Sequence, residues 1–110
     1  MKQTELNAFK RKYLDSSKRI NLGTIVHDPG TTPAHRRLVL EVCEWAHKMG
    51  FQFITRAFLK EGKIVDVVIP DLPRPFVEIR DSELKKTKEY LSQYENDIIF
   101  VDVIDPFKLT

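Results

Sequence analysis

The sequence contains few of the features that mark secreted, membrane or zinc-bound proteins. It has one cysteine, Cys43, so an intramolecular disulfide is excluded and a cysteine-based zinc site is implausible. No apolar run is long enough for a membrane span, and charge from Lys2 onward leaves no hydrophobic signal segment. Internal repeats and low-complexity tracts are also absent. We therefore expect a cytoplasmic protein in a reducing environment, with no membrane partner.

The composition indicates one soluble globular domain. The chain has 110 residues, of which 42% are hydrophobic and 31% charged, which is enough for a single core. Its net charge is only +2, so composition alone does not indicate a nucleic-acid binder. The basic residues are nevertheless unevenly distributed, and many lie near the N-terminus: Lys2, Lys10, Arg11, Lys12, Lys18, Arg19, Arg36 and Arg37. This asymmetry indicates a local phosphate-binding face.

The first part of the chain is expected to form an arm. Leu6, Phe9, Tyr13 and Leu14 recur at helical spacing, which predicts an amphipathic helix over residues 4 to 14 with a basic outer face. Turn-forming residues predict a loop over residues 15 to 33, with a short extended piece at 23 to 26. We therefore divide the chain into an arm, residues 1 to 31, and a core, residues 32 to 110.

The core begins with a predicted helix. Thr32 followed by Pro33 is a typical N-cap and first helical position, and Gly50 is a natural residue after a C-cap. The helix should therefore end at Lys48 or Met49. Its inward-facing stripe is expected to contain Leu38, Val42, Trp45, Ala46 and Met49. A strand is predicted next, over residues 51 to 58.

The stretch from residue 62 to 80, GKIVDVVIPDLPRPFVEIR, contains two apolar strands joined by a proline-rich turn. Each strand carries one carboxylate within apolar sequence, Asp66 in the first and Glu78 in the second. Burying a lone carboxylate is costly, so Asp66 needs a metal ion or another cation nearby. The alternative is a buried Asp66 that is bonded to turn amides or to Arg80.

The alternation of the second strand places Glu78 and Arg80 on one face and Val77 and Ile79 on the other. If the two strands pair as a hairpin, Asp66 and Glu78 lie side by side. Two convergent carboxylates suit Mg²⁺ or Mn²⁺, whose shell is completed by water and a substrate phosphate. This arrangement is typical of metal-dependent phosphodiester chemistry.

A second helix is predicted from Asp81 or Ser82 to about Tyr94, with Lys85, Lys86 and Lys88 on its basic surface. These lysines either form a solvated helix face or contact DNA. Residues 98 to 104 then form a strongly apolar strand, which a right-handed crossover makes parallel to residues 76 to 80. The element order is therefore helix, three strands, helix, strand.

With this order, the pair Asp66 and Glu78-Ile79-Arg80 resembles the PD-(D/E)xK nuclease superfamily, which includes archaeal Holliday-junction resolvases. The resemblance covers residues 32 to 104. It implies an α/β fold with a restriction-endonuclease-like αβββαβ core, whose mixed central sheet is flanked by helices. It also implies that Asp66, Glu78 and the backbone carbonyl of Ile79 bind Mg²⁺ or Mn²⁺, and that DNA is the substrate.

Arg80 departs from the family pattern, which has lysine at this position. Arginine stays charged and does not act as a base, although it can clamp a phosphate and stabilise charge in the transition state. It can equally form an ion pair with Glu78. The missing amine could come instead from Lys85 or Lys86, or catalysis has been lost.

The first helix also departs from the pattern. The family commonly has an acid near the start of this helix, where Ala34 and His35 stand here. Glu41 lies on the same helical side and is the best remaining candidate, and the alternative is a solvated surface residue. The three histidines have no ligand-like spacing, so we interpret them as surface or internally bonded residues.

These observations predict a Mg²⁺-dependent DNA endonuclease. The alternative is a catalytically degenerate nuclease-like domain that binds nucleic acid or a protein partner without cleavage. A duplex has two strands, so a domain with one carboxylate pair is expected to act as a homodimer. The candidate dimer surfaces are the helix around Phe9 and Tyr13 and the segment Pro106-Phe107, unless both fold back on their own domain.

Overall fold

The computed structural model describes residues 1–80 and 98–102, and for Arg80 and residues 98–102 it describes the backbone alone. The elements, in chain order, are α1 (Gln3–Tyr13), β1 (Asn21–Leu22), α2 (Pro33–Lys48), β2 (Ile54–Phe58), β3 (Ile64–Val68), β4 (Phe76–Arg80) and β5 (Ile98–Asp102). Within this part of the chain, no helix is long and apolar enough to cross a membrane.

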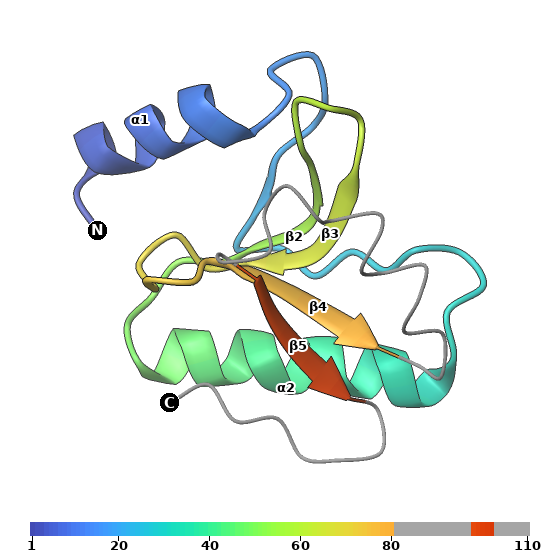
Figure 1. Ribbon diagram of the computed structural model, residues 1–110. Helices are drawn as coiled ribbons and strands as arrows, with labels where there is room; N and C mark the ends of the chain where they lie inside the picture. Colours follow the sequence, from blue (N-terminus) through green and yellow to red (C-terminus); the bar gives the residue numbers. More distant parts are fainter. Residues whose placement is uncertain (81–97, 103–110) are drawn as a thin grey trace.

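The strands form one five-stranded sheet in the order β1-β2-β3-β4-β5 (Figure 1). Neighbouring strands are antiparallel except β4 and β5, which are parallel. The α/β class and the parallel pairing of the last strand are therefore confirmed. The predicted helix from Asp81 or Ser82 to Tyr94, which would connect β4 to β5, lies outside the described residues, as do residues 103 and 104 of the predicted strand.

Helix α2 begins and ends where its capping residues predict. The hydroxyl of Thr32 accepts a hydrogen bond from the His35 amide at 3.1 Å, and Pro33 is the first helical residue. At the other end Gly50 has a φ of +77°, and its N–H donates to the His47 carbonyl at 3.0 Å. Met49, predicted to face the core, is 55% exposed, because it is the C-cap residue and the stripe ends before it.

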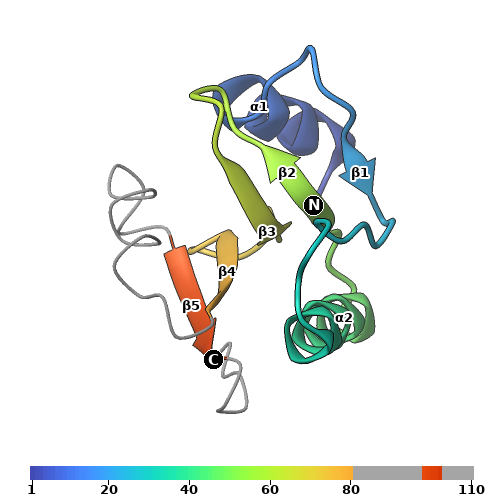
Figure 2. The ribbon, with the colours of Figure 1, turned by 90° about the vertical axis from the view of Figure 1, so that its right-hand side faces the viewer.

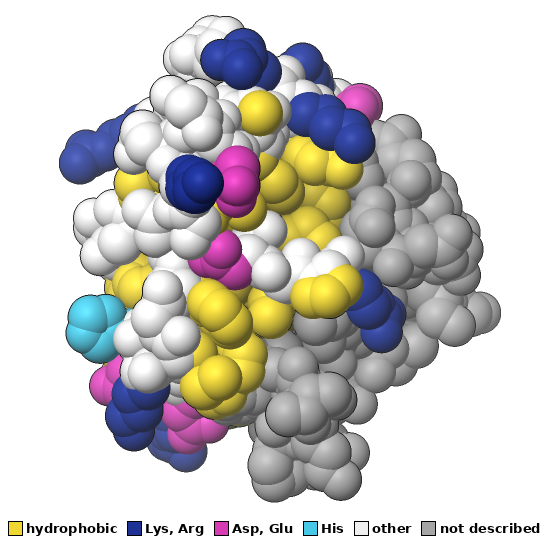
Figure 3. All heavy atoms as spheres, turned by 90° about the vertical axis from the view of Figure 1, so that its left-hand side faces the viewer, with side chains coloured by type: hydrophobic (Ala, Val, Ile, Leu, Met, Phe, Trp, Pro, Cys, Tyr) yellow, Lys and Arg dark blue, Asp and Glu magenta, His cyan; other side chains and the backbone are white. Residues whose placement is uncertain are grey.

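Helix α2 lies along one face of the sheet (Figures 1 and 2). Its buried side chains pack with those of β3 and β4 in one core cluster: Leu38, Val39, Val42, Cys43, Ala46, Val67, Ile69, Val77 and Ile79. The predicted strand from residue 51 begins only at Ile54, because the Phe51 amide donates to the Ala46 carbonyl at 2.9 Å and ties the chain to the helix end. Apolar side chains are exposed on the side of the domain where α2 ends (Figure 3).

The predicted N-terminal helix is present as α1 and is part of the domain core. Leu6 is fully buried, and the ring centroids of Phe9 and Tyr13 lie 6.2 and 5.3 Å from that of Phe76 in β4. These contacts belong to a second core cluster between α1 and the sheet, which contains Leu14, Ile54, Ala57, Leu59, Val65, Val68 and Phe76. Phe9 and Tyr13, proposed above as a dimer surface, therefore fold back on their own domain, and Pro106-Phe107 lies outside the described residues.

The extended piece expected at residues 23 to 26 lies instead at β1, residues 21 and 22. Gly23 has a φ of +68°, so the chain turns away from β2 after its amide donates to the Phe53 carbonyl at 2.8 Å. The following residues are held by one side chain of β2, Thr55. Its hydroxyl donates to the Thr24 carbonyl at 2.5 Å and accepts from the Val26 amide at 2.9 Å.

Candidate functional site

The strand register places three charged residues in one row across the middle of the sheet. Residues 55 and 57 of β2 pair with residues 67 and 65 of β3, so Arg56 and Asp66 lie opposite each other. Val67 pairs with Val77 of β4, so the next position in the row is Glu78. The row Arg56, Asp66 and Glu78 therefore crosses β2, β3 and β4, and the predicted proximity of the two carboxylates follows from it.

The regular pairing of β3 with β4 ends at this row. Only Val67↔Val77 and Val68↔Phe76 form ladder pairs, and beyond them Oδ2 of Asp66 accepts a hydrogen bond from the Ile79 amide at 2.9 Å. A side-chain carboxylate thus takes the place of a backbone carbonyl. The donor is an amide of β4 and not one of the turn amides that we gave above as an alternative for Asp66.

Asp66 also contacts His35, a residue that the sequence analysis did not assign to the site. His35, in the first turn of α2, places its Nε2 3.3 Å from Oδ2 of Asp66, and the two side chains are 12% and 11% exposed. The available signal was the position of His35, near the start of the predicted helix, where the nuclease pattern that the sequence resembles commonly has an acid. The helix N-cap at Thr32 fixes this turn and so aims His35 at β3.

Asp66 and Glu78 lie opposite each other and have opposite pKa shifts. Desolvation raises the pKa of Glu78 well above its usual value, and the negative charge of Asp66 raises it further. Desolvation also acts on Asp66, but the hydrogen bonds from His35, Glu78 and the Ile79 amide outweigh it and lower the pKa of Asp66. As the pH rises, Asp66 therefore loses its proton before Glu78 does.

A further ion pair lies at the same row. Arg56 donates from Nε to Oδ1 of Asp28, which lies in the loop before α2. The charge of Asp28 also contributes to the raised pKa of Glu78, so this third carboxylate faces the pair. Arg56 has a φ of +43°, a left-handed conformation that is unusual for a residue with a side chain inside a strand.

Asp28 and Arg56 were not among the predicted site residues. Arg56 is the one charged residue within the apolar stretch from residue 51 to 58, which was the available signal. Nothing in the sequence around Asp28 distinguished it from other loop acids. Loops and special backbone conformations are nevertheless common at functional sites, so these two residues belong to the candidate site.

The other predicted site residues are placed as follows. Glu41 is exposed on α2, six residues beyond His35, and His35 is the helix residue that contacts Asp66. Arg80 ends β4, where its backbone pairs with Asp102, and its side chain lies outside the described part of the structure. Lys85 and Lys86 lie outside the described residues.

The donor set can be compared with what a divalent ion requires. Among the residues that the structure describes, no group of three or more His, Cys, Asp or Glu side chains is placed to hold a metal. Two carboxylates are however sufficient for Mg²⁺, which keeps several water ligands. Oε2 of Glu78 is buried and has no hydrogen-bond partner within the described residues, so one oxygen remains available for such an ion. The pair Asp66 and Glu78 therefore fits Mg²⁺ or Mn²⁺.

Comparisons of this chain with family models, with curated proteins and with solved structures found no significant match.

Proposed function

We propose that this chain is a metal-dependent DNA endonuclease of the PD-(D/E)xK type with a restriction-endonuclease-like fold. The observation that carries the proposal is the pair of carboxylates Asp66 and Glu78, which lie opposite each other on adjacent strands at the row where the pairing of β3 and β4 ends. The chain order supports it, since a helix precedes three antiparallel strands and a parallel strand lies beside the third.

The two carboxylates have different roles in this proposal. Asp66, whose pKa is lowered, is held in place by His35 and the Ile79 amide, so it would be a preorganised ligand. Glu78, whose pKa is raised, would bind a cation in its ionised form, and the Ile79 carbonyl would be a further ligand. A divalent ion bound there would supply an activated water and neutralise charge on the attacked phosphate. Arg56 lies in the same row and is paired with Asp28, and its remaining guanidinium N–H groups would favour an approaching phosphodiester.

The proposal is tested with supercoiled, linear and branched DNA and Mg²⁺ or Mn²⁺. We expect the wild-type protein to cut DNA only with metal, and Asp66→Asn and Glu78→Gln to reduce the rate by about 100-fold or more, because each removes a ligand. Glu44→Gln is the matched control, since Glu44 is an exposed carboxylate on α2. The proposed endonuclease activity would be refuted if the wild-type protein did not cut DNA, or if Asp66→Asn cut it equally well.

A homodimer belongs to the same proposal, because cutting both strands of a duplex requires two sites. Phe9 and Tyr13 pack against Phe76 of their own chain, so we expect the interface elsewhere. Sedimentation equilibrium, with and without DNA, measures the mass directly. A monomer under both conditions would leave an enzyme that nicks one strand.

A second candidate function is a nuclease-like domain that binds nucleic acid without cutting it. The specific observation in its favour is that Oδ2 of Asp66 already accepts from both His35 and the Ile79 amide, which satisfies this oxygen without metal. Arg80 in place of the family lysine points the same way. Salt-sensitive DNA affinity that a chelator leaves unchanged, with no cleavage, would favour this function. No affinity at low salt would favour a protein-binding role.

A further inference from the structure

A hollow of about 560 Å³ lies between α1, the segment that follows it and the turn between β2 and β3. Its lining includes three cations from two separate elements, Lys10 and Arg11 of α1 and Lys60 of the turn. Leu14 and Ile20 supply the apolar part of its lining. The hollow is therefore a shaped, positively charged surface outside the carboxylate site described above.

Backbone contacts fix the two walls of this hollow against each other. Leu14 and Leu59 form a β-bridge, and the Lys60 amide donates to the Tyr13 carbonyl at 3.1 Å. The Asp15 amide donates to the Phe58 carbonyl at 2.9 Å. The end of α1 and the turn therefore form one unit, and the cations that they carry are held on opposite sides of a common space.

The cations of the hollow have no ion-pair partner among the residues that the structure describes. No carboxylate among the described residues forms a salt bridge with Lys10, Arg11 or Lys60. The surrounding sequence is also strongly biased, since residues 1 to 20 contain six of the 18 basic residues but only two of the 16 acidic ones. In the remaining 90 residues acidic residues outnumber basic ones. A positive potential is therefore concentrated on this part of the surface.

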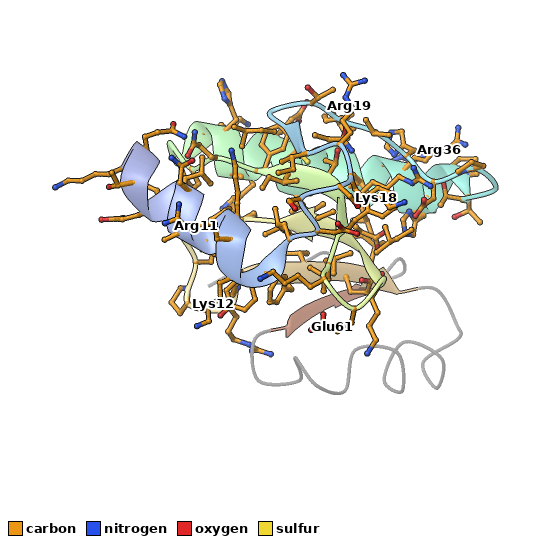
Figure 4. The ribbon with its side chains drawn as sticks, turned by 90° about the horizontal axis from the view of Figure 1, so that it is seen from above. Arg11, Lys12, Lys18, Arg19, Arg36 and Glu61 are labelled. Atoms are coloured by element: carbon orange, nitrogen blue, oxygen red, sulfur yellow. The ribbon has the colours of Figure 1, made fainter. Side chains whose placement is uncertain are left out.

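More basic side chains extend this surface away from the hollow. Figure 4 shows Arg11 and Lys12 extending from α1 and Lys18 and Arg19 from the segment after it. Nζ of Lys18 lies 5.8 Å from the ring centroid of Phe58. The Arg56 guanidinium lies 5.3 Å from the same ring, and Arg56 belongs to the row that contains Asp66. Cationic groups thus follow one another from the hollow to the candidate site.

We propose that the hollow and the basic side chains beside it bind the phosphate backbone of a nucleic acid and guide it toward the row of Arg56 and Asp66. The proposal rests on the proposed function, because it takes the substrate to be a nucleic acid. Two contacts favour a nucleic acid over an anionic membrane: Leu6 is fully buried, and Phe9 packs against Phe76. Helix α1 therefore lacks the exposed apolar face with which helices enter a bilayer.

The test measures the affinity for a labelled DNA duplex by fluorescence anisotropy over a range of salt concentrations, with EDTA present. Lys10→Gln is compared with Lys48→Gln, because both residues are lysines in the last turn of a helix and have the same expected effect on helix stability. We expect Lys10→Gln to weaken binding several-fold and to lower the salt slope by about 0.9, the value for one phosphate contact on B-DNA. Lys48→Gln should change neither.

Two further variants complete the experiment. Lys60→Gln should act like Lys10→Gln although it lies on another element, and Lys10→Gln/Arg11→Gln should lower the slope by about 1.8. Equal effects of Lys10→Gln and Lys48→Gln, or no effect of either, would reject the hollow as the binding site. Binding of the same variants to anionic vesicles but not to DNA would replace the nucleic acid with a membrane surface. Unfolding midpoints in urea verify that each variant is folded.

The outcome of this binding experiment is separable from that of the cleavage experiment. EDTA removes divalent ions, so DNA affinity is measured without metal-dependent cleavage. DNA affinity that depends on Lys10 but occurs without cleavage in Mg²⁺ would uphold this inference and refute the endonuclease. Cleavage that Lys10→Gln leaves unchanged, in rate and in salt dependence, would uphold the endonuclease and refute the hollow as its DNA-binding surface.

Discussion

A single hydroxyl group, that of Thr55, connects the sheet to the loop that carries Asp28. The Thr55 side chain in β2 is fully buried, donates to the Thr24 carbonyl and accepts from the Val26 amide. Asp28 follows two residues later and pairs with Arg56, the neighbour of Thr55. Replacing the hydroxyl should therefore affect both the stability of the domain and the position of one candidate site residue.

The expected magnitude follows from the groups that lose their partner. Thr55→Val preserves shape but leaves two backbone groups unsatisfied, each of which costs about 1–3 kcal/mol when buried. Thr24 is exposed, so water can reach its carbonyl, whereas Val26 is half-buried. We therefore expect a loss of about 2–3 kcal/mol, mostly from the Val26 amide. Thr55→Ser keeps the hydroxyl, removes one buried methyl group and should cost about 1 kcal/mol.

Urea unfolding followed by the fluorescence of Trp45 measures the free energy of unfolding of both variants. Hydrogen exchange of the Val26 amide gives a local readout, since its protection should fall in Thr55→Val and persist in Thr55→Ser. If Thr55→Ser costs as much as Thr55→Val, the methyl group rather than the hydroxyl stabilises this region. The reasoning from unsatisfied backbone groups would then be wrong.

Three other predictions concern the titratable groups of the domain. Because the pKa of Glu78 is raised in the folded state, the folded protein binds more protons than the unfolded chain between the ordinary glutamate pKa and the raised one. The free energy of unfolding should therefore fall as the pH rises through this window. Glu78→Gln should flatten this part of a profile of urea midpoint against pH. Burial raises the pKa of the Cys43 thiol to about 12, so a thiol reagent at neutral pH should label Cys43 only in unfolded protein. Rapid labelling of the native protein would contradict the core position of Cys43. His35→Ala should raise the pKa of Asp66, which a carboxyl-detected NMR titration measures, whereas an unchanged value would mean that the His35 contact is absent in solution.

The parts of the fold that short-range patterns encode were predictable. The boundaries of α2 follow from Thr32, Pro33 and Gly50, whose capping roles depend on residues three or four positions away. The alternation in β4 likewise separates Phe76, in the cluster under α1, from Val77, in the cluster under α2. Two details were predicted wrongly because periodicity does not determine them. The exposure of Met49 follows from its position at the end of α2, and the late start of β2 follows from the hydrogen bond between the Phe51 amide and the Ala46 carbonyl.

The carboxylate pair was predictable for a different reason. Asp66 stands in a run of β-branched residues, where an ionisable group needs a compensating partner, and the hairpin brings Glu78 opposite it. His35, Arg56 and Asp28 were not identified, because their contacts join α2, β2 and a loop. Which residues meet across such distances depends on strand register and on how a helix packs, and no local pattern specifies either.

The same geometry also explains why the pair is asymmetric. Two adjacent carboxylates in a buried site repel each other when both are ionised, so their pKa values are pushed apart. Which pKa is raised depends on the partners of each carboxylate: Asp66 contacts His35 and accepts from the Ile79 amide, whereas Oε2 of Glu78 has no partner within the described residues. If the pair binds a divalent ion as proposed, the ion would compensate the same negative charge that a proton on Glu78 compensates. A proton and the ion would then compete for Glu78, whose pKa is raised, while His35 and the Ile79 amide hold Asp66 in place.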